Sequence, residues 1–279
     1  MIPGKPGTET SFLNSVPPPE GVQPGGRPEL RENWWSEVFA VLRKDVRSEL
    51  RTRGAMGTLL MFALTTLILI AFSVQTTGLG LTIALLPEPE FSQALEQRAS
   101  VLVTRPTAFR AGLLASLYWV ILYFSATNGL PRVFVKEEEM GTAAVLRLTA
   151  RPSAVFTGKL LFNLGLLGFL TGILVPLFTL FLEPAIRDWP SFLGHVVVGA
   201  AAIAGTATLL GALVARTSNR GYLMVVLGFG PLLPVLILGI NGTAAAIQGT
   251  GGNNLLGLVS YFVMMTLVSG LLFEKVWAQ

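Results

Sequence analysis

Long apolar stretches without Asp, Glu, Lys or Arg recur along the chain between residues 54 and 273. One membrane-spanning helix needs about 20 such residues. The stretches predict six spans, near 57–77, between 110 and 132, between 159 and 183, between 188 and 216, and near 221–240 and 255–273. The last two come from one charge-free run that is too long for one crossing, and we expect the Gly- and Asn-rich residues 241–254 to divide it. The pattern therefore predicts an all-α, polytopic membrane protein with six transmembrane helices.

The residues before the first span have two other patterns. Residues 1–33 contain seven Pro and five Gly with almost no apolar periodicity, which predicts a disordered tail. Residues 34–53 repeat apolar residues at helical spacing and carry basic residues on the other side, which predicts an amphipathic helix. Glu49 falls inside the apolar stripe, and we expect it to pair with Arg53 or another basic group. This helix suits either the headgroup layer against anionic lipid or a packed position on the aqueous side.

Charge supports the membrane assignment and orients it. Only 13% of the residues are charged, whereas a soluble domain carries roughly 25%. The loops on the side of the N-terminus hold thirteen Lys and Arg, and those on the other side hold four. Because basic residues near span ends are retained in the cytoplasm, we expect both termini to be cytoplasmic. The domains are then a tail at 1–33, an interfacial helix at 34–53 and a six-span domain at 54–279.

Several kinds of chemistry are excluded by the residue inventory. The chain has no Cys and a single His, so it cannot build a thiolate or multi-histidine metal site by itself. The one Gly-Lys pair, Gly158-Lys159, lacks the other residues of a phosphate-binding loop. The spans carry no charged residue for ion coupling. We therefore expect no catalytic residue, no metal and no nucleotide site on this chain, and energy for transport would come from a partner.

The loop at 131–159 is the most informative segment outside the spans. It contains three consecutive acids at 137–139, then Gly141 and a short segment, 143–151, that can form a helix with Thr142 as its cap and Pro152 at its end. Met140, Ala144, Val145 and Leu148 give this helix an apolar side. Two interpretations remain open from the loop alone: a helix that docks in a groove of a soluble partner, or a solvated connection.

Glycines and prolines mark the spans themselves. Gly165, Gly168 and Gly172 on the third span predict close helix contacts, as do glycines on the fourth and fifth spans. His195 is expected near the outer start of the fourth span, where an imidazole could ligate heme iron or face lipid headgroups. Trp119 on the second span is expected to anchor at the membrane interface or to stack on a porphyrin.

The chain resembles the heme exporter protein B (CcmB) family, a branch of the ABC-2 type permeases, over roughly residues 36–277. The motifs that carry the resemblance are LRKDVRSELRTR, LYWVILYF, KEEEMGT followed by LTARP and GKLLFN, and ARTSNRGYLMVVLGFGPLLPVLILG. The Pro- and Gly-rich residues 1–33 depart from the family pattern.

The resemblance implies a permease subunit of an ATP-driven complex that exports or handles heme for c-type cytochrome biogenesis in the bacterial inner membrane. Its coupling element maps onto Glu137, Glu138, Glu139 and Gly141, and the candidate heme contacts are His195 and Trp119. The implied partners are an ABC ATPase subunit that binds ATP, a second copy of the chain, a heme-handling membrane subunit and a periplasmic heme chaperone. A non-transporting scaffold that couples ATP hydrolysis to release of the heme-loaded chaperone, and a permease for a lipid or drug, are alternatives.

Overall fold

The computed structural model describes residues 33–76, 94–214, 220–251 and 254–278, and the predicted tail lies outside them apart from residue 33. The regular structure of the described residues is entirely helical. Its helices are α1 (Trp34–Thr52), α2 (Gly54–Thr76), α4 (Ala94–Gly129), α5 (Arg132–Glu139), α6 (Thr142–Thr149), α7 (Pro152–Leu182), α8 (Trp189–Val214), α9 (Arg220–Gln248) and α10 (Asn254–Ala278). The all-α prediction is confirmed.

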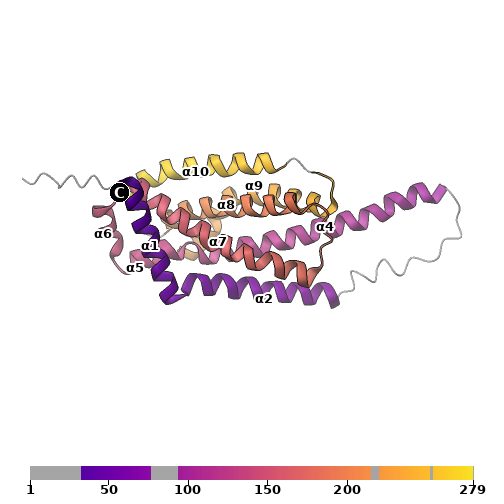
Figure 1. Ribbon diagram of the computed structural model, residues 1–279, viewed down its shortest axis with the longest axis horizontal. Coiled ribbons are helices and arrows are strands. Elements are labelled where there is room, and N and C mark those ends of the chain that lie inside the picture. The colour runs from indigo at the N-terminus through magenta and orange to yellow at the C-terminus, as the bar shows by residue number, and fades with distance from the viewer. Residues whose placement is uncertain (1–32, 77–93, 215–219, 252–253, 279) are drawn as a thin grey trace, which may run out of the picture. The chain divides into compact units, whose positions relative to one another are not determined.

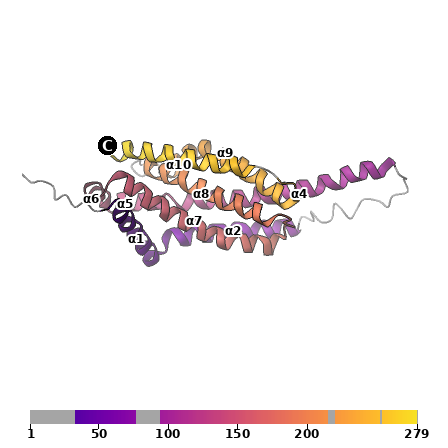
Figure 2. The same ribbon diagram turned by 45° about the horizontal axis from the view of Figure 1, so that its top comes forward.

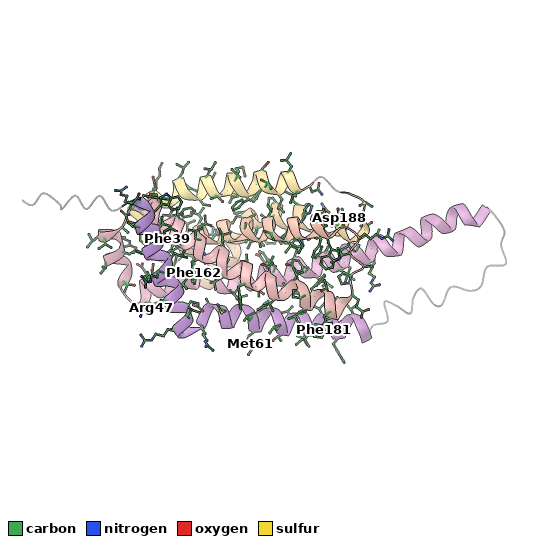
Figure 3. All side chains as sticks on the ribbon, in the orientation of Figure 1. Phe39, Arg47, Met61, Phe162, Phe181 and Asp188 are labelled. Carbon is green, nitrogen blue, oxygen red and sulfur yellow. The ribbon has the colours of Figure 1, made fainter. Side chains whose placement is uncertain are left out.

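Six helical segments among the described residues are long and apolar enough to cross a membrane. They are Gly54–Val74, Ala108–Glu139, Pro152–Leu182, Trp189–Val214, Val226–Gln248 and Asn254–Lys275. Each overlaps one predicted span, so the six-span prediction is confirmed. Exposed apolar side chains such as Met61 and Phe181 project from the sides of these helices, while Arg47 and Asp188 lie toward opposite ends (Figure 3).

The predicted break in the fifth span is wrong over residues 241–248. Helix α9 continues through them to Gln248, and Gly249 and Gly251, with φ of 72° and 64°, make the turn. The Thr243 hydroxyl donates to the Gly239 carbonyl at 2.8 Å, one turn earlier, so it stays within the helical pattern. Gly242 is suited to the helix because a Cβ there would lie 2.0 Å from Cδ2 of His195. Packing against a neighbouring helix therefore overrides the turn tendency of the Asn-Gly-Thr sequence.

Helix α8 is the central element of the bundle and packs against α7, α9 and α10 (Figure 1). Within its apolar window 78% of the residues are buried, the largest share among the six spans. The Trp119 side chain of α4 is fully buried against two glycines, Gly199 of α8 and Gly239 of α9. Small residues thus bring three helices close around one large ring.

The glycines of α7 have another role. A Cβ at Gly165, Gly168 or Gly172 would meet no described atom within 4 Å, so the predicted close helix contacts there are wrong within this chain. Gly168 and Gly172 instead line an apolar groove between α7 and α8. Sequence spacing identifies small residues but does not identify which side of a helix has a neighbour.

Helix α1 does not run along the bundle. In both ribbon views it lies across one end, close to α5, α6 and the start of α7 (Figures 1 and 2). It joins the first span at Arg53. This single residue, with a φ of 49°, makes the change of direction between α1 and α2. An amphipathic helix that lies across the end of a span bundle is suited to the membrane surface.

The Trp119 packing leads to a testable prediction. Gly239→Ala would place a Cβ 2.4 Å from Cζ2 of Trp119, a ring held by a 3.1 Å hydrogen bond to Thr243. We expect a loss of about 1–3 kcal/mol in the free energy of unfolding, because a packed core must shift to admit the methyl group. Gly228→Ala in the same helix is the matched control, since a Cβ there would meet Leu210 only at an ordinary contact distance of 3.4 Å. Equal unfolding temperatures for the two variants in detergent would contradict this packing.

Candidate functional site

The start of α7 forms the surface on which α1 rests. A Cβ at Gly158 would lie 2.9 Å from Cβ of Val41 and 3.1 Å from the Val38 carbonyl, so glycine allows α1 to approach closely. The Glu37 carboxylate accepts the backbone N–H of Arg151 at 3.0 Å, next to Pro152 in the first turn of α7. These contacts hold α1 at the beginning of the third span.

Glu49 has a different partner from the one predicted. Its side chain is buried, and Oε1 accepts the backbone N–H of Met56 at 2.8 Å. Met56 lies in the first turn of α2, where backbone N–H groups have no helical partner and the helix dipole favours an anion. The expected pairing with Arg53 is therefore wrong, and a carboxylate in the apolar stripe is accommodated as a cap for the first span.

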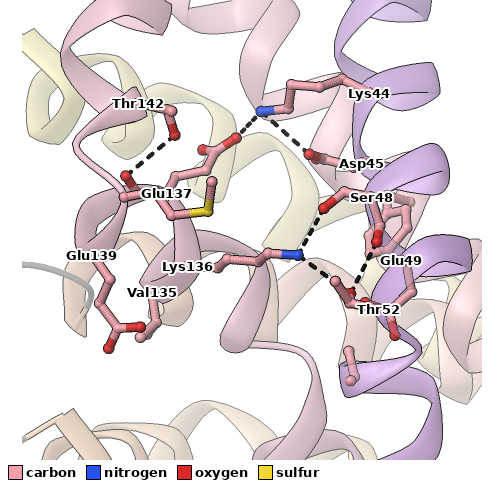
Figure 4. Close-up of a pocket in the computed structure, with 14 residues that line it drawn as sticks. Lys44, Asp45, Ser48, Glu49, Thr52, Val135, Lys136, Glu137, Glu139 and Thr142 are labelled. Carbon is pink, nitrogen blue, oxygen red and sulfur yellow. Dashed lines mark hydrogen bonds and ion pairs between the residues drawn. The ribbon is translucent and has the colours of Figure 1, made fainter.

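A group of four charges, three of them buried, connects α1, α5 and α7, and Figure 4 shows its members Lys44, Asp45 and Glu137. Lys159 of α7 is 0% exposed, and its Nζ lies 2.8 Å from Oε2 of Glu137 and 3.5 Å from Oδ2 of Asp45. Lys44 of α1 pairs with the same two carboxylates, at 3.3 Å from Asp45 and in close contact with Glu137. The Lys159 ammonium also lies over the Phe134 ring, 4.6 Å from its centroid. Two cations thus balance two anions, and we call Lys44, Asp45, Glu137 and Lys159 the ion-pair cluster.

The electrostatics of α1 reflect this burial. Desolvation raises the pKa of Asp45 above its ordinary value, against the opposing effect of the Lys159 and Lys44 cations. For Lys44, burial lowers the pKa, but the Asp45 and Glu137 carboxylates outweigh it and raise the pKa overall. Lys44 therefore stays charged, and each carboxylate of the ion-pair cluster faces two cations.

The segment after the second span folds into two short helices with a tight turn between them. Helix α5 ends at Glu139, and Gly141 precedes α6 with a φ of 67°, in the left-handed region that favours glycine. The Thr142 hydroxyl donates to the Glu137 carbonyl at 3.3 Å, and Thr142 itself is the first residue of α6. Gly141 therefore adopts a conformation that glycine favours, whereas the predicted cap at Thr142 and the predicted helix end at Pro152 are wrong. Pro152 instead begins α7.

The acidic residues of this segment point to different places. Glu137 is buried in the ion-pair cluster, Glu138 pairs with Arg147 of α6 at 3.3 Å, and Glu139 is exposed. The Arg147 guanidinium also lies 5.1 Å from the ring centroid of Trp277, at the end of α10. The three consecutive acids suggest one surface in sequence, but successive helical residues point about 100° apart.

The outer side of α6 and the turn before it carry exposed apolar side chains. Met140, Val145 and Leu148 are 64%, 60% and 88% exposed. They lie at the same end of the bundle as the exposed Glu139. Figure 4 shows Glu139 and the turn that leads to Thr142. We call α5, the turn at 140–141 and α6 the coupling segment.

A second polar group lies inside the bundle, away from the ion-pair cluster. His195 is 0% exposed, its Nδ1 lies 2.7 Å from the Ser191 carbonyl, and its Nε2 has no hydrogen-bond partner among the described residues. Trp119 is also 0% exposed. The expectation that these side chains face headgroups is therefore wrong, because α8 and α4 turn them toward α9. A Cβ on Gly242 would lie 2.2 Å from His195 Nε2, so no porphyrin fits between α8 and α9 in this arrangement.

Comparison with known proteins identifies the family. The family model described as CcmB protein matches residues 105–274, which span α4 to α10. The chain belongs to the CcmB family. No match was found among the curated proteins.

Membership makes the chain a multi-pass membrane permease subunit of an ABC system for heme export or cytochrome c maturation, and not itself a catalytic enzyme. The match includes Glu137 and Lys159 but not α1, which supplies Lys44 and Asp45.

The ion-pair cluster could not be assembled from the sequence alone. The sequence pattern places Lys159 at a span end and indicates no role for Asp45. One signal was present, since Asp45 and Glu49 both lie in the stripe of α1 that contains Val38 and Val41 and is buried. Two acids within a buried stripe require partners, but the sequence does not indicate that Asp45 finds a buried cation in Lys159, 114 positions away.

Removing Lys159 should test the cluster. Lys159→Met leaves two buried carboxylates with one cation, and we expect a loss of about 3–5 kcal/mol in the free energy of unfolding. Adding Glu137→Gln should recover part of that loss, because Asp45 keeps Lys44 as its partner. Lys275→Met, at an exposed position of α10, is the control. The measurement is thermal unfolding in detergent. Equal unfolding temperatures for Lys159→Met and the control would show that the cluster does not stabilise the fold.

Proposed function

We propose that the chain is the membrane subunit of an ATP-driven complex of the bacterial inner membrane that exports or handles heme for c-type cytochrome biogenesis. In this proposal ATP binds to a separate ABC ATPase subunit, and heme is the substrate. The family assignment and the six spans support a membrane role. The absence of a phosphate-binding loop from the sequence supports a separate ATPase.

The observation that carries the coupling role is the geometry of the coupling segment. Its α6 presents exposed Val145 and Leu148 beside an exposed acid, Glu139, which suits docking in an apolar groove with a basic rim. Its α5 carries Glu137, which is paired with Lys44 of α1 and Lys159 of α7. A force applied to α6 would therefore reach two other helices through one carboxylate.

This arrangement assigns different roles to the acidic residues. Glu139 contacts the ATPase subunit, and Glu138 holds α6 through Arg147. Glu137 transmits movement without touching the partner, and Gly141 sets the angle of the turn.

Other partners follow from the same proposal. A pathway between two six-span halves requires a second copy of the chain, since one chain supplies six spans. A heme-handling membrane subunit and a periplasmic heme chaperone would complete the complex. Ligation of heme by His195 would require α8 and α9 to separate, because Gly242 occupies the space beside Nε2.

That close packing favours one second candidate function. A membrane scaffold could couple ATP hydrolysis to release of a heme-loaded chaperone without passing heme through its own helices. His195 and Trp119 would then be packing residues. Loss of heme delivery with intact chaperone release in a His195→Ala variant would support transport. Intact heme delivery with impaired chaperone release would support the scaffold.

The orientation of the chain can be measured directly. The coupling role requires α5 and α6 to be cytoplasmic, and the basic loops, with thirteen Lys and Arg against four, favour this orientation. A fluorescent reporter fused at Gln279 should therefore be active in the cytoplasm. An alkaline phosphatase reporter placed after Gly251 should be active in the periplasm. The reverse pattern would overturn both the topology and the coupling role.

The docking surface can be tested by charge. Leu148→Asp and Val145→Asp place an acid on the exposed apolar side of α6, and we expect at least tenfold less ATPase subunit to co-purify, since desolvating an unpaired charge at an interface is costly. Glu139→Lys should act in the same direction and more weakly, because an exposed rim charge contributes little.

The control is Leu256→Asp, an equally apolar position that is 73% exposed in the first turn of α10, where a helix tolerates an acid. The same preparations should contain two copies of the chain by native mass analysis. If all α6 variants keep the ATPase subunit and cytochrome yield of the unmodified chain, the coupling segment is only a connection between spans.

A further inference from the structure

An open groove runs between α1 and α5 on the side of α1 that faces away from its buried stripe. Its volume is about 830 Å³, and the residues that line it are Ala40, Arg43, Lys44, Arg47, Ser48, Arg51, Thr52, Lys136 and Met140. Five of these are basic and none is acidic. A groove with this lining carries a concentrated positive potential.

Three of the cations are not neutralised. Arg43, Arg47 and Arg51 recur every four residues, so they form one row along α1, and all three are exposed. No carboxylate lies within 4 Å of their guanidinium groups among the residues that the structure describes. Exposed arginines of this kind are free to bind an anion.

The opposite wall of the groove adds a cation with fixed geometry. Lys136 of α5 donates to the Ser48 hydroxyl at 2.7 Å and to the Thr52 hydroxyl at 3.3 Å. An ammonium held by two neutral hydroxyls keeps its full positive charge. Both hydroxyls and the ammonium line the groove together with the arginine row.

On the flank of the arginine row away from Lys136, α1 carries exposed apolar side chains. Trp35, Phe39 and Leu50 are 54%, 59% and 62% exposed. On a helix with 3.6 residues per turn these positions lie between the buried stripe and the arginine row. Figure 3 shows Phe39 and Arg47 on α1 at the end of the bundle. Residue 53 joins α1 directly to the first span, so this surface lies at the membrane boundary.

We propose that the groove between α1 and α5 is a binding site for the phosphate headgroup of an anionic phospholipid. The phosphate lies between the arginine row and Lys136, and the acyl chains run along Trp35, Phe39 and Leu50. A guanidinium matches phosphate through two parallel hydrogen bonds, which favours the arginines as the main contacts. The proposal does not depend on the identity of the substrate or on the ATPase docking surface of α6.

Two features favour a lipid over other anions. A soluble phosphate would use the cations but leave the exposed aromatic and leucine side chains uncovered. An acidic protein surface would also leave them facing lipid at the membrane boundary. A phospholipid binds both the cationic groove and the exposed apolar side chains, because its phosphate headgroup and acyl chains are joined in one molecule.

The test uses the full chain in a neutral detergent, titrated with phosphatidylglycerol or phosphatidylcholine and followed by native mass analysis. We expect the unmodified chain to prefer phosphatidylglycerol. Arg47→Gln with Arg51→Gln should reduce that preference by about 25-fold, since each basic residue near an anionic surface contributes about a factor of five. The matched control is Arg110→Gln with Arg187→Gln, which removes two charges from exposed positions of α4 and of the segment before α8.

The outcomes separate the alternatives. An unchanged lipid preference in the Arg47 and Arg51 variant, or an equal loss in the control, would overturn the site. Displacement of phosphatidylglycerol by millimolar inorganic phosphate would assign the groove to a free anion and overturn the lipid assignment. Loss of ATPase co-purification with intact lipid preference would assign the arginine row to the partner protein. A selective loss of phosphatidylglycerol with normal ATPase binding would support the lipid site even if the α6 docking role failed.

Discussion

The buried ammonium of Lys159 is the interaction on which one end of this protein depends. It stands at the start of the third span and contacts one carboxylate from α1 and one from α5. In a low-dielectric interior a lone charge would be expensive, so the two acids and Lys44 must be present together. The cluster therefore fixes the position of a surface helix and of the coupling segment relative to a membrane span. The neighbouring apolar contacts, such as Phe134 on Lys159, exclude water from the Lys159 ammonium.

The architecture of the spans was predictable because charge-free stretches and length determine it almost alone. Six spans and an amphipathic first helix follow from local pattern. The expectations fail where a contact with another helix decides the outcome. Gly242 continues a helix because His195 needs its space, and Glu49 caps α2 across a one-residue corner. In each case local sequence gave a correct tendency, and a tertiary contact outweighed it.

The acid run at 137–139 shows why a candidate site is harder to read than a fold. In sequence the three residues form a single negative patch. In the structure one is internal, one is paired within the segment and one is exposed, because a helix distributes consecutive residues around its axis. A motif that is uniform in composition can therefore combine a structural function and a surface function. The family assignment locates the segment in a permease, but the distribution of roles comes from the side-chain geometry.

The spacing of the ion-pair cluster along the chain also has a consequence for biosynthesis. Asp45 and Lys159 are separated by 114 positions, and Lys44 and Glu137 by 93. The ribosome therefore releases Lys44 and Asp45 well before Glu137 and Lys159, which complete the cluster. Until the third span has entered the membrane, the carboxylates have only Lys44 and water as partners. Closure of the cluster thus reports that the first three spans have been inserted in the correct order, and a chain truncated before Lys159 would retain an exposed, hydrated end that differs from the finished protein.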